Sequence, residues 1–211
     1  MSTSSTLTYN SFEKQVYDVT FNNNDHITTT VTNVAYVAEQ WISEVKYVHH
    51  HRLHKLIVGL DIEWRPNNRF HPNNPVAILQ VCVGRRCLIF QIHYFVGGLP
   101  ECLEDFLKEE SYKFVGVGIE KDIIKLEEDL NMTVSKAYEL GDLAEGRYNE
   151  KWLKNVGLKG LAKQVLGIEL EKPKHISRSN WAVRYLSYEQ VEYATVDAFV
   201  SFEIGRILFL D

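Results

Sequence analysis

The chain has 211 residues, of which 45% are hydrophobic and 24% charged, and its formal net charge is −5. These proportions predict a soluble globular protein and exclude disordered, collagen-like and membrane-spanning chains, since no window approaches roughly 18 consecutive apolar residues. An acidic protein does not hold long nucleic acid over its whole surface, so any polyanion is expected to bind at a local site, with a metal ion. One domain over residues 1–211 is predicted, in the cytoplasm or nucleus, because the N-terminus lacks an apolar signal core and the cysteines form no paired pattern.

The N-terminal elements are predicted from polar and β-branched segments. Residues 1–14 are polar and predict a mobile lead. Residues 15–32 contain two β-prone segments around an Asn-Asn-Asn-Asp turn signal, so they predict an N-terminal β-hairpin. A helix with Asn33 as its cap is expected next, because apolar residues recur at helical spacing over residues 34–45.

The rest of the chain begins with strands and then alternates helices with strands. An apolar run predicts a buried strand at residues 56–62, followed by a proline-containing loop. Further strands are predicted at 76–83, 87–92, 113–118 and 136–140, and helices at 99–109, 119–130, 157–166 and 187–208. This order predicts an α/β fold with a mixed central sheet flanked by helices.

Two carboxylates stand at the end of the buried strand. Asp61 and Glu63 occupy positions i and i+2, and side chains at that spacing in a strand point to the same face. Two like charges at a partly buried site are costly unless a cation neutralises them, and oxygen ligands favour Mg²⁺ or Mn²⁺ over zinc. The alternative interpretation is that the strand leaves the core here and its acidic side chains meet water.

A tyrosine and two further aspartates complete the candidate set. Tyr193 and Asp197 lie four residues apart in the predicted last helix, which stacks both side chains on one face. Asp122 lies in the first turn of another helix, where a carboxylate suits the helix dipole. In isolation, a solvated Tyr–Asp pair and a helix cap explain these residues equally well. Four acids and a tyrosine in the order Asp, Glu, Asp, Tyr, Asp weaken both structural explanations.

This set resembles that of the DEDD superfamily of 3′–5′ exonucleases, in its tyrosine-bearing branch and close to Werner-syndrome-type exonuclease domains. The resemblance covers about residues 50–208 and rests on motifs that fall in the expected structural context. The motifs are Asp61-Ile62-Glu63-Trp64, Gly116-Val117-Gly118-Ile119-Glu120-Lys121-Asp122 and Tyr193-Ala194-Thr195-Val196-Asp197-Ala198, with similar segments at Leu158-Lys159-Gly160-Leu161-Ala162 and Ser179-Asn180-Trp181. The resemblance implies the ribonuclease H-like, DnaQ-type fold.

The resemblance also implies a role for each candidate residue. Asp61, Glu63 and Asp197 would hold a Mg²⁺ or Mn²⁺ ion that activates water, with Asp61 bridging to a second ion. Asp122 would reach the second ion, and Tyr193 would orient the attacking water. Two ions about 4 Å apart would neutralise the scissile phosphate, and nucleoside 5′-monophosphates would leave from the 3′ end.

Candidate contacts with nucleic acid lie beside these motifs, at Trp64, Lys121, Arg178, Asn180 and Trp181. Trp64 and Trp181 are expected to stack a terminal base, although a tryptophan at a strand end is more often a core residue. Arg178 closes a basic segment that starts at Lys172 and predicts either a backbone-contacting edge or a solvated loop. Lys121 and Arg65 replace a glycine and a proline that are common in the family. Either change is expected to alter substrate binding, and neither removes a metal ligand.

Two other patterns are not assigned a function. Gly116-Val117-Gly118 has Lys121 in place of the third glycine of a dinucleotide fingerprint. The histidine tract at residues 49–54 lies at a helix end among basic residues and predicts a solvated terminus rather than a zinc site.

The sequence therefore predicts a metal-dependent 3′–5′ exonuclease of single-stranded ends, with RNA favoured over DNA. A free-standing nuclease is expected, and as such it resembles the small plant exoribonucleases that clear RNA-silencing complexes and form ring-shaped homo-hexamers. That likeness implies a homo-hexamer with contacts through the hairpin at 15–32, and an Argonaute-type partner. Three alternatives stay open: a Werner-like DNA exonuclease, a catalytically weak binding module, and an endonuclease of the ribonuclease H kind.

Overall fold

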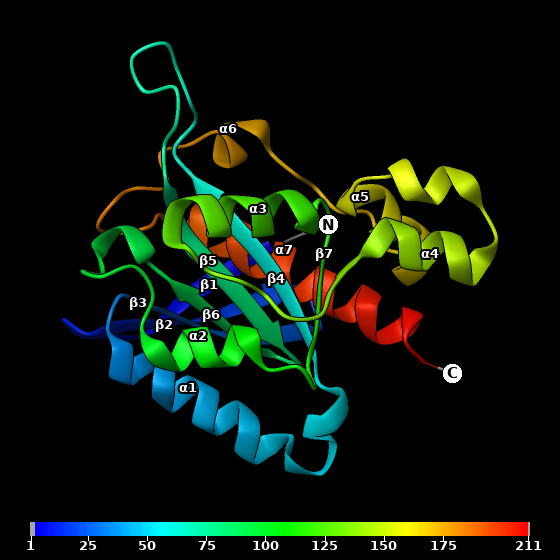
Figure 1. Ribbon diagram of the computed structural model, residues 1–211, viewed down its shortest axis with the longest axis horizontal. Coiled ribbons are helices and arrows are strands. Elements are labelled where there is room, and N and C mark those ends of the chain that lie inside the picture. The colour runs from blue at the N-terminus through cyan, green and yellow to red at the C-terminus, as the bar shows by residue number, and fades with distance from the viewer. Residues whose placement is uncertain (1–2, 211) are drawn as a thin grey trace.

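An eight-stranded mixed sheet forms the centre of the structure, a computed structural model that describes residues 3–210. The strands are β1 (Thr3–Asn10), β2 (Lys14–Phe21), β3 (Asp25–Thr32), β4 (Ile57–Trp64), β5 (Val76–Val83), β6 (Arg86–Phe90), β7 (Lys113–Gly116) and β8 (Ala137–Glu139). Their order across the sheet is β1-β2-β3-β6-β5-β4-β7-β8 (Figure 1). β4 pairs antiparallel with β5 and parallel with β7, so both kinds of ladder meet at the strand that carries Asp61 and Glu63.

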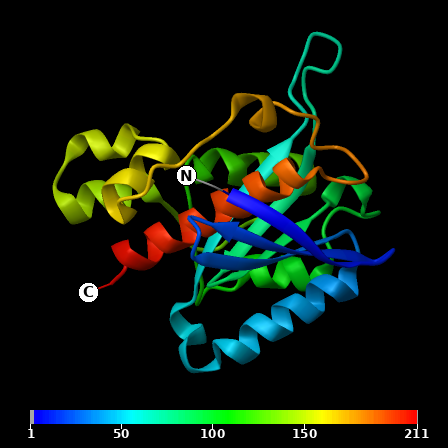
Figure 2. The same cartoon turned by 180° about the vertical axis from the view of Figure 1, so that it is seen from behind.

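Helices cover both faces of this sheet. They are α1 (Ala35–Val48), α2 (Glu101–Lys108), α3 (Ile119–Leu130), α4 (Leu140–Tyr148), α5 (Leu158–Leu161, continued by a π-helical turn at Ala162–Leu166), α6 (Lys174–Ser177) and α7 (Tyr188–Leu208). α1, α2 and α3 lie on one face and α7 crosses the other (Figures 1 and 2). The predicted α/β class, a mixed central sheet flanked by helices, is confirmed. No helix within residues 3–210 is long and apolar enough to cross a membrane.

The N-terminal segment differs from the mobile lead predicted for residues 1–14. Thr3–Asn10 form β1, which pairs antiparallel with β2, and β2 pairs antiparallel with β3 at the position of the predicted hairpin. β1 is an edge strand whose residues alternate between half-buried and exposed over most of its length, so it forms with few apolar residues. A polar composition therefore did not reveal it, and residues 1 and 2 lie outside the described part of the chain.

The start of α1 corrects the predicted cap at Asn33. Val34 is the N-cap residue, and no side chain caps the helix. The Asn33 side-chain amide instead donates to the carbonyl oxygen of Tyr94 at 3.0 Å. This partner lies far along the chain, and a local capping pattern carries no information about it. Two helices, α4 and α6, were also absent from the sequence prediction.

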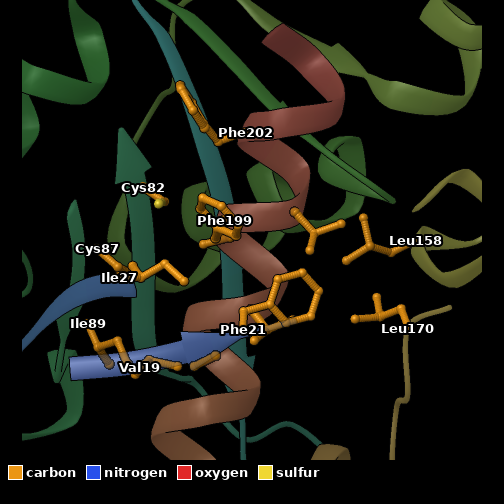
Figure 3. Packing of buried hydrophobic residues seen from close by; sticks show 14 of the residues in the cluster. Val19, Phe21, Ile27, Cys82, Cys87, Ile89, Leu158, Leu170, Phe199 and Phe202 are labelled. Atoms are coloured by element: carbon orange, nitrogen blue, oxygen red, sulfur yellow. The ribbon is translucent and has the colours of Figure 1, made fainter. Parts of the chain in front are cut away.

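α7 approaches β4 so closely that the strand needs a glycine there. A Cβ built on Gly59 would lie 2.0 Å from the carbonyl oxygen of Ala198. Ala194 and Ala198 are small, buried residues of α7, and their size allows this close approach. Phe199 and Phe202 fill the adjoining core between α7 and the sheet (Figure 3). The packing fixes the position of α7 relative to β4, and the candidate site depends on that position.

Candidate active site

Three carboxylates from two elements meet on the α7 side of the sheet. Asp61 and Glu63 project from β4, and Asp197 projects from α7. One oxygen of each carboxylate lies within 4.8 Å of the other two. The close approach of α7 at Gly59, two residues before Asp61, brings the third carboxylate within reach. We call Asp61, Glu63 and Asp197 the carboxylate cluster.

Burial and mutual repulsion raise the pKa of the clustered carboxyl groups. Burial is the largest cause for all three. The pKa of Glu63 rises to about 10, with the charge of Asp61 as the next cause. The pKa of Asp61 rises well above its ordinary value, and the charges of Asp197 and Asp122 add to the effect of burial. Ionised carboxylates in such a group need a cation beside them, and a donor set of oxygens on rigid elements fits Mg²⁺ or Mn²⁺.

Asp122 lies near the cluster without belonging to it. It stands in the first turn of α3 and is only 8% exposed. Burial, followed by the negative charge of Glu139, raises the pKa of Asp122 to about 7. Because its own charge raises the pKa of Asp61 and Glu63, the structure couples all four predicted acids electrostatically.

Glu139 is a residue of this region that the sequence prediction missed. Its carboxylate accepts hydrogen bonds from the backbone N–H groups of Gly118 at 2.8 Å and Ile119 at 3.2 Å. It therefore caps α3 and fixes the turn that presents Asp122, at which Gly118 has a φ of +74°. The available signal was an acidic residue at the end of β8, because β8 lies beside the strand that leads into this turn.

Lys172 supplies a positive charge to the carboxylate cluster. Its Nζ lies 2.5 Å from Asp197 Oδ2, and the two side chains are 32% and 5% exposed, respectively. The same Nζ lies 5.2 Å from the ring centroid of Tyr193. The charge of Lys172 lowers the pKa of every acid in the cluster and of Asp122. The sequence predicted that the segment starting at Lys172 is a backbone-contacting edge or a solvated loop. At Lys172 this prediction is corrected, because its side chain contacts the carboxylate cluster.

Tyr193 stands one turn before Asp197 on α7. Its hydroxyl hydrogen-bonds the Asp197 carboxylate, which helps to stabilise the ionised acid. Burial, and then the charge of Asp197, raises the pKa of Tyr193 above its usual value, so the hydroxyl keeps its proton at neutral pH. Tyr193 is therefore a hydrogen-bond donor at the cluster, as its predicted role requires.

Trp181 supports Tyr193 and has no surface for a base. Its exposed fraction is 0%, its indole N–H donates to the carbonyl oxygen of Ser177 at 3.4 Å, and its ring centroid lies 5.9 Å from that of Tyr193. The predicted stacking of a terminal base on Trp181 is therefore corrected. The residues that precede it in the sequence are polar, which predicted an accessible ring. Segments that are distant in sequence bury it, and the local sequence carries no information about them.

The other predicted nucleic-acid contacts occupy different surroundings. Trp64 is the last residue of β4 and is half-buried. Lys125 Nζ lies 5.1 Å from the centroid of its ring. Asn180 has a structural role, because its side-chain oxygen accepts from the N–H of Ala182 at 3.1 Å. Lys121 and Arg178 are exposed.

A cavity of about 270 Å³ adjoins the cluster on the side of the N-terminal strands. Its lining consists of Thr3, Phe21, Leu170, Glu171, Pro173, His175, Ile176, Glu189, Glu192, Tyr193, Val196 and Asp197. Leu170, Glu171 and Pro173 flank Lys172 in sequence. Lys172 therefore has space and further carboxylates nearby if its ammonium group leaves Asp197.

Comparison with known proteins agrees with this geometry. The sequence profile of the family described as 3′–5′ exonuclease matches residues 33–210. The chain belongs to the 3′–5′ exonuclease family. A 3′–5′ exonuclease of Arabidopsis thaliana is 35% identical over 156 residues, and this match covers 72% of the chain and 52% of the relative. The mouse bifunctional 3′–5′ exonuclease/ATP-dependent helicase WRN is 36% identical over 72% of the chain and 11% of the relative. The chain thus spans about half or less of the length of these relatives.

Solved structures of other proteins share the fold. Brucella melitensis NrnC superposes with a TM-score of 0.61 at 19% identity, covering 74% of this chain and 73% of that one. The EXD2 exonuclease domain gives a TM-score of 0.51 at 26% identity and covers 85% of this chain and 88% of its own. The ribonuclease H-like fold implied by the sequence motifs is confirmed.

Proposed function

We propose that this protein is a 3′–5′ exonuclease that hydrolyses single-stranded nucleic acid with the help of divalent metal ions. The observation that carries the proposal is the meeting of three carboxylate oxygens within 4.8 Å, with Tyr193 one helical turn from Asp197. Membership of the exonuclease family supports it. Crystals of the EXD2 exonuclease domain were soaked in Mn, and others in Mg and GMP, which supports the same choice of ions here.

The residues for metal binding follow from the donor set. Asp61, Glu63 and Asp197 would hold one ion, and Asp61 with Asp122 would hold the second. When bound, such ions neutralise the scissile phosphate, acidify a water molecule and stabilise the leaving oxygen. The four acids supply negative charge that attracts the ions. Their raised pKa values mean that metal binding must displace protons or the ammonium group of Lys172.

The tyrosine has a separate role in the proposed reaction. A hydroxyl that keeps its proton at neutral pH donates a hydrogen bond and also accepts one, so Tyr193 would orient the attacking water without acting as a base. Trp181 packs against the Tyr193 ring and would hold it in that orientation.

RNA is the favoured substrate in this proposal, and nucleoside 5′-monophosphates are the expected products. The preference rests on the resemblance of the sequence to small plant exoribonucleases. The identity of 36% to the WRN exonuclease-helicase supports DNA as the alternative substrate.

A time course with matched 5′-labelled RNA and DNA strands tests activity, direction and substrate together. We expect a ladder that shortens from the 3′ end with Mg²⁺ or Mn²⁺ and no degradation with EDTA. Faster loss of DNA would reverse the substrate preference, and internal fragments would indicate an endonuclease. Intact strands under every metal would contradict the proposal and favour the catalytically weak binding module.

Asp61→Ala and Asp197→Ala variants connect that activity to the cluster. Both are expected to abolish turnover while circular dichroism shows a folded protein. Near wild-type turnover in either variant would contradict the metal assignment.

Assembly and partners form a further part of the proposal. The resemblance to small plant exoribonucleases implies a homo-hexamer, an Argonaute-type partner and a location in the cytoplasm or nucleus. Among the described strands β1 has one neighbour, so its outer edge is free to meet a second copy beside the hairpin at 15–32. Light scattering after size-exclusion chromatography distinguishes the mass of six chains from the 24.5 kDa of one chain. The mass of a single chain would contradict the hexamer.

A further inference from the structure

The loop between β4 and β5 is a basic segment on an acidic protein. Residues 65–75, which we call the β4–β5 loop, contain Arg65, Arg69 and His71 and no acidic residue, whereas the whole chain has a net charge of −5. Arg65 and Arg69 are exposed. The loop follows directly after Trp64, which is the last residue of β4. The same strand carries Asp61 and Glu63. It therefore places positive charge directly beyond a site that repels phosphates.

The tip of this loop presents an aromatic ring to solvent. Phe70 is 72% exposed, and the Arg69 guanidinium carbon lies 4.5 Å from the centroid of its ring. An exposed phenylalanine has no role in the core, and a ring paired with a guanidinium offers both a stacking face and a charge for phosphate. Single-stranded nucleic acid is bound elsewhere by this combination of flat rings and cations.

Hydrogen bonds inside the loop hold this arrangement. The Asn68 side-chain oxygen accepts from the backbone N–H groups of Phe70 at 2.9 Å and His71 at 3.0 Å. The Asn74 amide donates to the carbonyl oxygen of Pro66 at 3.1 Å and ties the two sides of the loop together. The ring and the guanidinium are thus presented before any ligand arrives, which lowers the entropic cost of binding.

The base of the loop is joined to the helix that carries Asp122. Lys125 Nζ donates to the carbonyl oxygen of Asn74 at 2.9 Å, and the Asp129 carboxylate accepts from the N–H of Val76 at 2.8 Å. Lys125 and Asp129 both belong to α3. The loop extends beyond the end of the sheet in both views (Figures 1 and 2). Its orientation is consequently set by the same elements that position the acids.

We propose that the β4–β5 loop is a docking surface for the single strand behind its 3′ end, with Phe70 stacking a base and Arg65 and Arg69 contacting phosphates. The inference rests on the proposed exonuclease function. It adds the position of the nucleotides that precede the 3′ end of the substrate. Charge decides the occupant, because a segment with two exposed arginines and no acidic residue complements a polyanion. Its bases then account for the exposed ring, which a phosphate alone would not require.

Binding is measured without metal, so that strand cleavage does not enter the result. Fluorescence anisotropy in EDTA uses a 5′-labelled single strand of about 12 nucleotides, within the usual span of such sites. We expect Phe70→Ser and Arg69→Gln each to weaken binding about tenfold, in line with the loss of one stacked base or one charge-assisted contact. The dependence of affinity on salt should also become shallower in Arg69→Gln, by about 0.7 in the log–log slope for a single strand.

The chain offers a matched control in another exposed Arg–Phe pair. Phe12 is 86% exposed, and the Arg184 guanidinium carbon lies 5.7 Å from its ring centroid. Phe12→Ser and Arg184→Gln remove the same chemical groups elsewhere on the surface, so both should bind the strand like the wild type.

Two outcomes would overturn the proposal. These are unchanged affinity in both loop variants, and an equal loss of affinity in the control variants. Failure of the proposed exonuclease function is separate, since it appears as uncut strands with Mg²⁺ or Mn²⁺ while anisotropy still reports binding.

Discussion

The carboxylate cluster and the β4–β5 loop are neighbours on one stretch of chain, yet different forces hold them in place. Asp61 and Glu63 stand on a strand against which α7 packs without room for a Cβ at Gly59. The loop stands in water and keeps its shape through hydrogen bonds such as those accepted by Asn68. The cluster is positioned by the core, and the loop is positioned by its own side chains.

This difference matches what each region has to do. Metal ligands must keep their relative positions within a fraction of an ångström, and packed strands and helices supply that precision better than loops do. A surface that follows a flexible polymer needs only a presented ring and charges. Substitutions in the two regions should therefore fail differently: those at the cluster lose metal binding and turnover, and those in the loop lose affinity for the strand.

The largest effect is expected from Gly59→Ala. The new Cβ would lie 2.0 Å from the carbonyl oxygen of Ala198, so α7 must move away from β4. We expect a loss of about 3 kcal/mol or more in the free energy of unfolding, measured by chemical denaturation. Gly146→Ala is the control, since nothing lies within 4 Å of its Cβ position and it is exposed in a helix, where alanine is favoured. Equal stability of the two variants would contradict the close packing.

Asp61→Asn separates the effect of the cluster on the stability of the metal-free protein from its effect on metal binding and turnover. Removing one like charge should raise the melting temperature of the metal-free protein, because the charge of Asp61 helps to raise the pKa of Glu63. The same variant should lose the thermal stabilisation by Mn²⁺ and about a thousandfold in turnover, as expected when several kcal/mol of metal assistance disappear. Differential scanning fluorimetry with EDTA and with Mn²⁺ measures the first two effects. A lower metal-free melting temperature would contradict this account of the site.

Tyr193→Phe should lower turnover by about a hundredfold, in the range for the loss of one positioned hydrogen-bonding group. Binding of Mn²⁺ should remain, because the three clustered carboxylates are unchanged in this variant. Isothermal titration calorimetry with Mn²⁺ measures metal binding separately from activity. Loss of metal binding would mean that Tyr193 acts on the ligands rather than on the water.

Lys172→Met tests whether the lysine competes with the metal ion. Its Nζ lies 2.5 Å from Asp197 Oδ2, so an ion bound to this oxygen must displace it. We expect Mn²⁺ affinity to rise about tenfold, or about 1.4 kcal/mol, while the metal-free melting temperature falls. Lys174→Met is the control in the same segment, and its side chain is exposed. Weaker Mn²⁺ binding in Lys172→Met would contradict the competition.

The last prediction concerns the pH dependence of stability in the metal-free protein. The pKa of Asp122 is about 7 in the folded chain against 3.8 ordinarily, so the folded state keeps a proton that the unfolded state has lost. Stability should therefore fall as pH rises from about 4 to about 7 and then level off for this group. Melting temperatures in EDTA across this range should fall less steeply in Asp122→Asn. An increase in the melting temperature of the wild type across this range would have the wrong sign.

The sequence predicted the members of the candidate site better than their surroundings. Asp61 and Glu63 follow from the two-residue period of a strand, and Tyr193 and Asp197 from the spacing of a helix. These periods depend only on neighbours along the chain. Whether β4 and α7 bring those faces together depends on the close approach at Gly59, which lies between distant segments.

The corrections share this physical origin. The polar segment at residues 3–10 became a strand because β2 offers it a ladder of hydrogen bonds, which composition does not reveal. Trp181 is buried by elements far from it in sequence, so it supports Tyr193 and does not stack a base. Lys172 belongs to a basic segment by sequence, yet its contact with Asp197 is decided by how that segment passes α7.

The sequence by itself determined the family motifs, the order of the strands and helices from residue 15 onward apart from α4 and α6, and the acids that its periods place on one face. The tertiary structure alone decided that Lys172 pairs with Asp197, that Glu139 caps α3, and that Phe70 and Arg69 are exposed to solvent. The reason is that short-range patterns encode the direction of a side chain within its element. Packing between elements decides which side chains meet, and therefore which charges are paired and which rings are exposed.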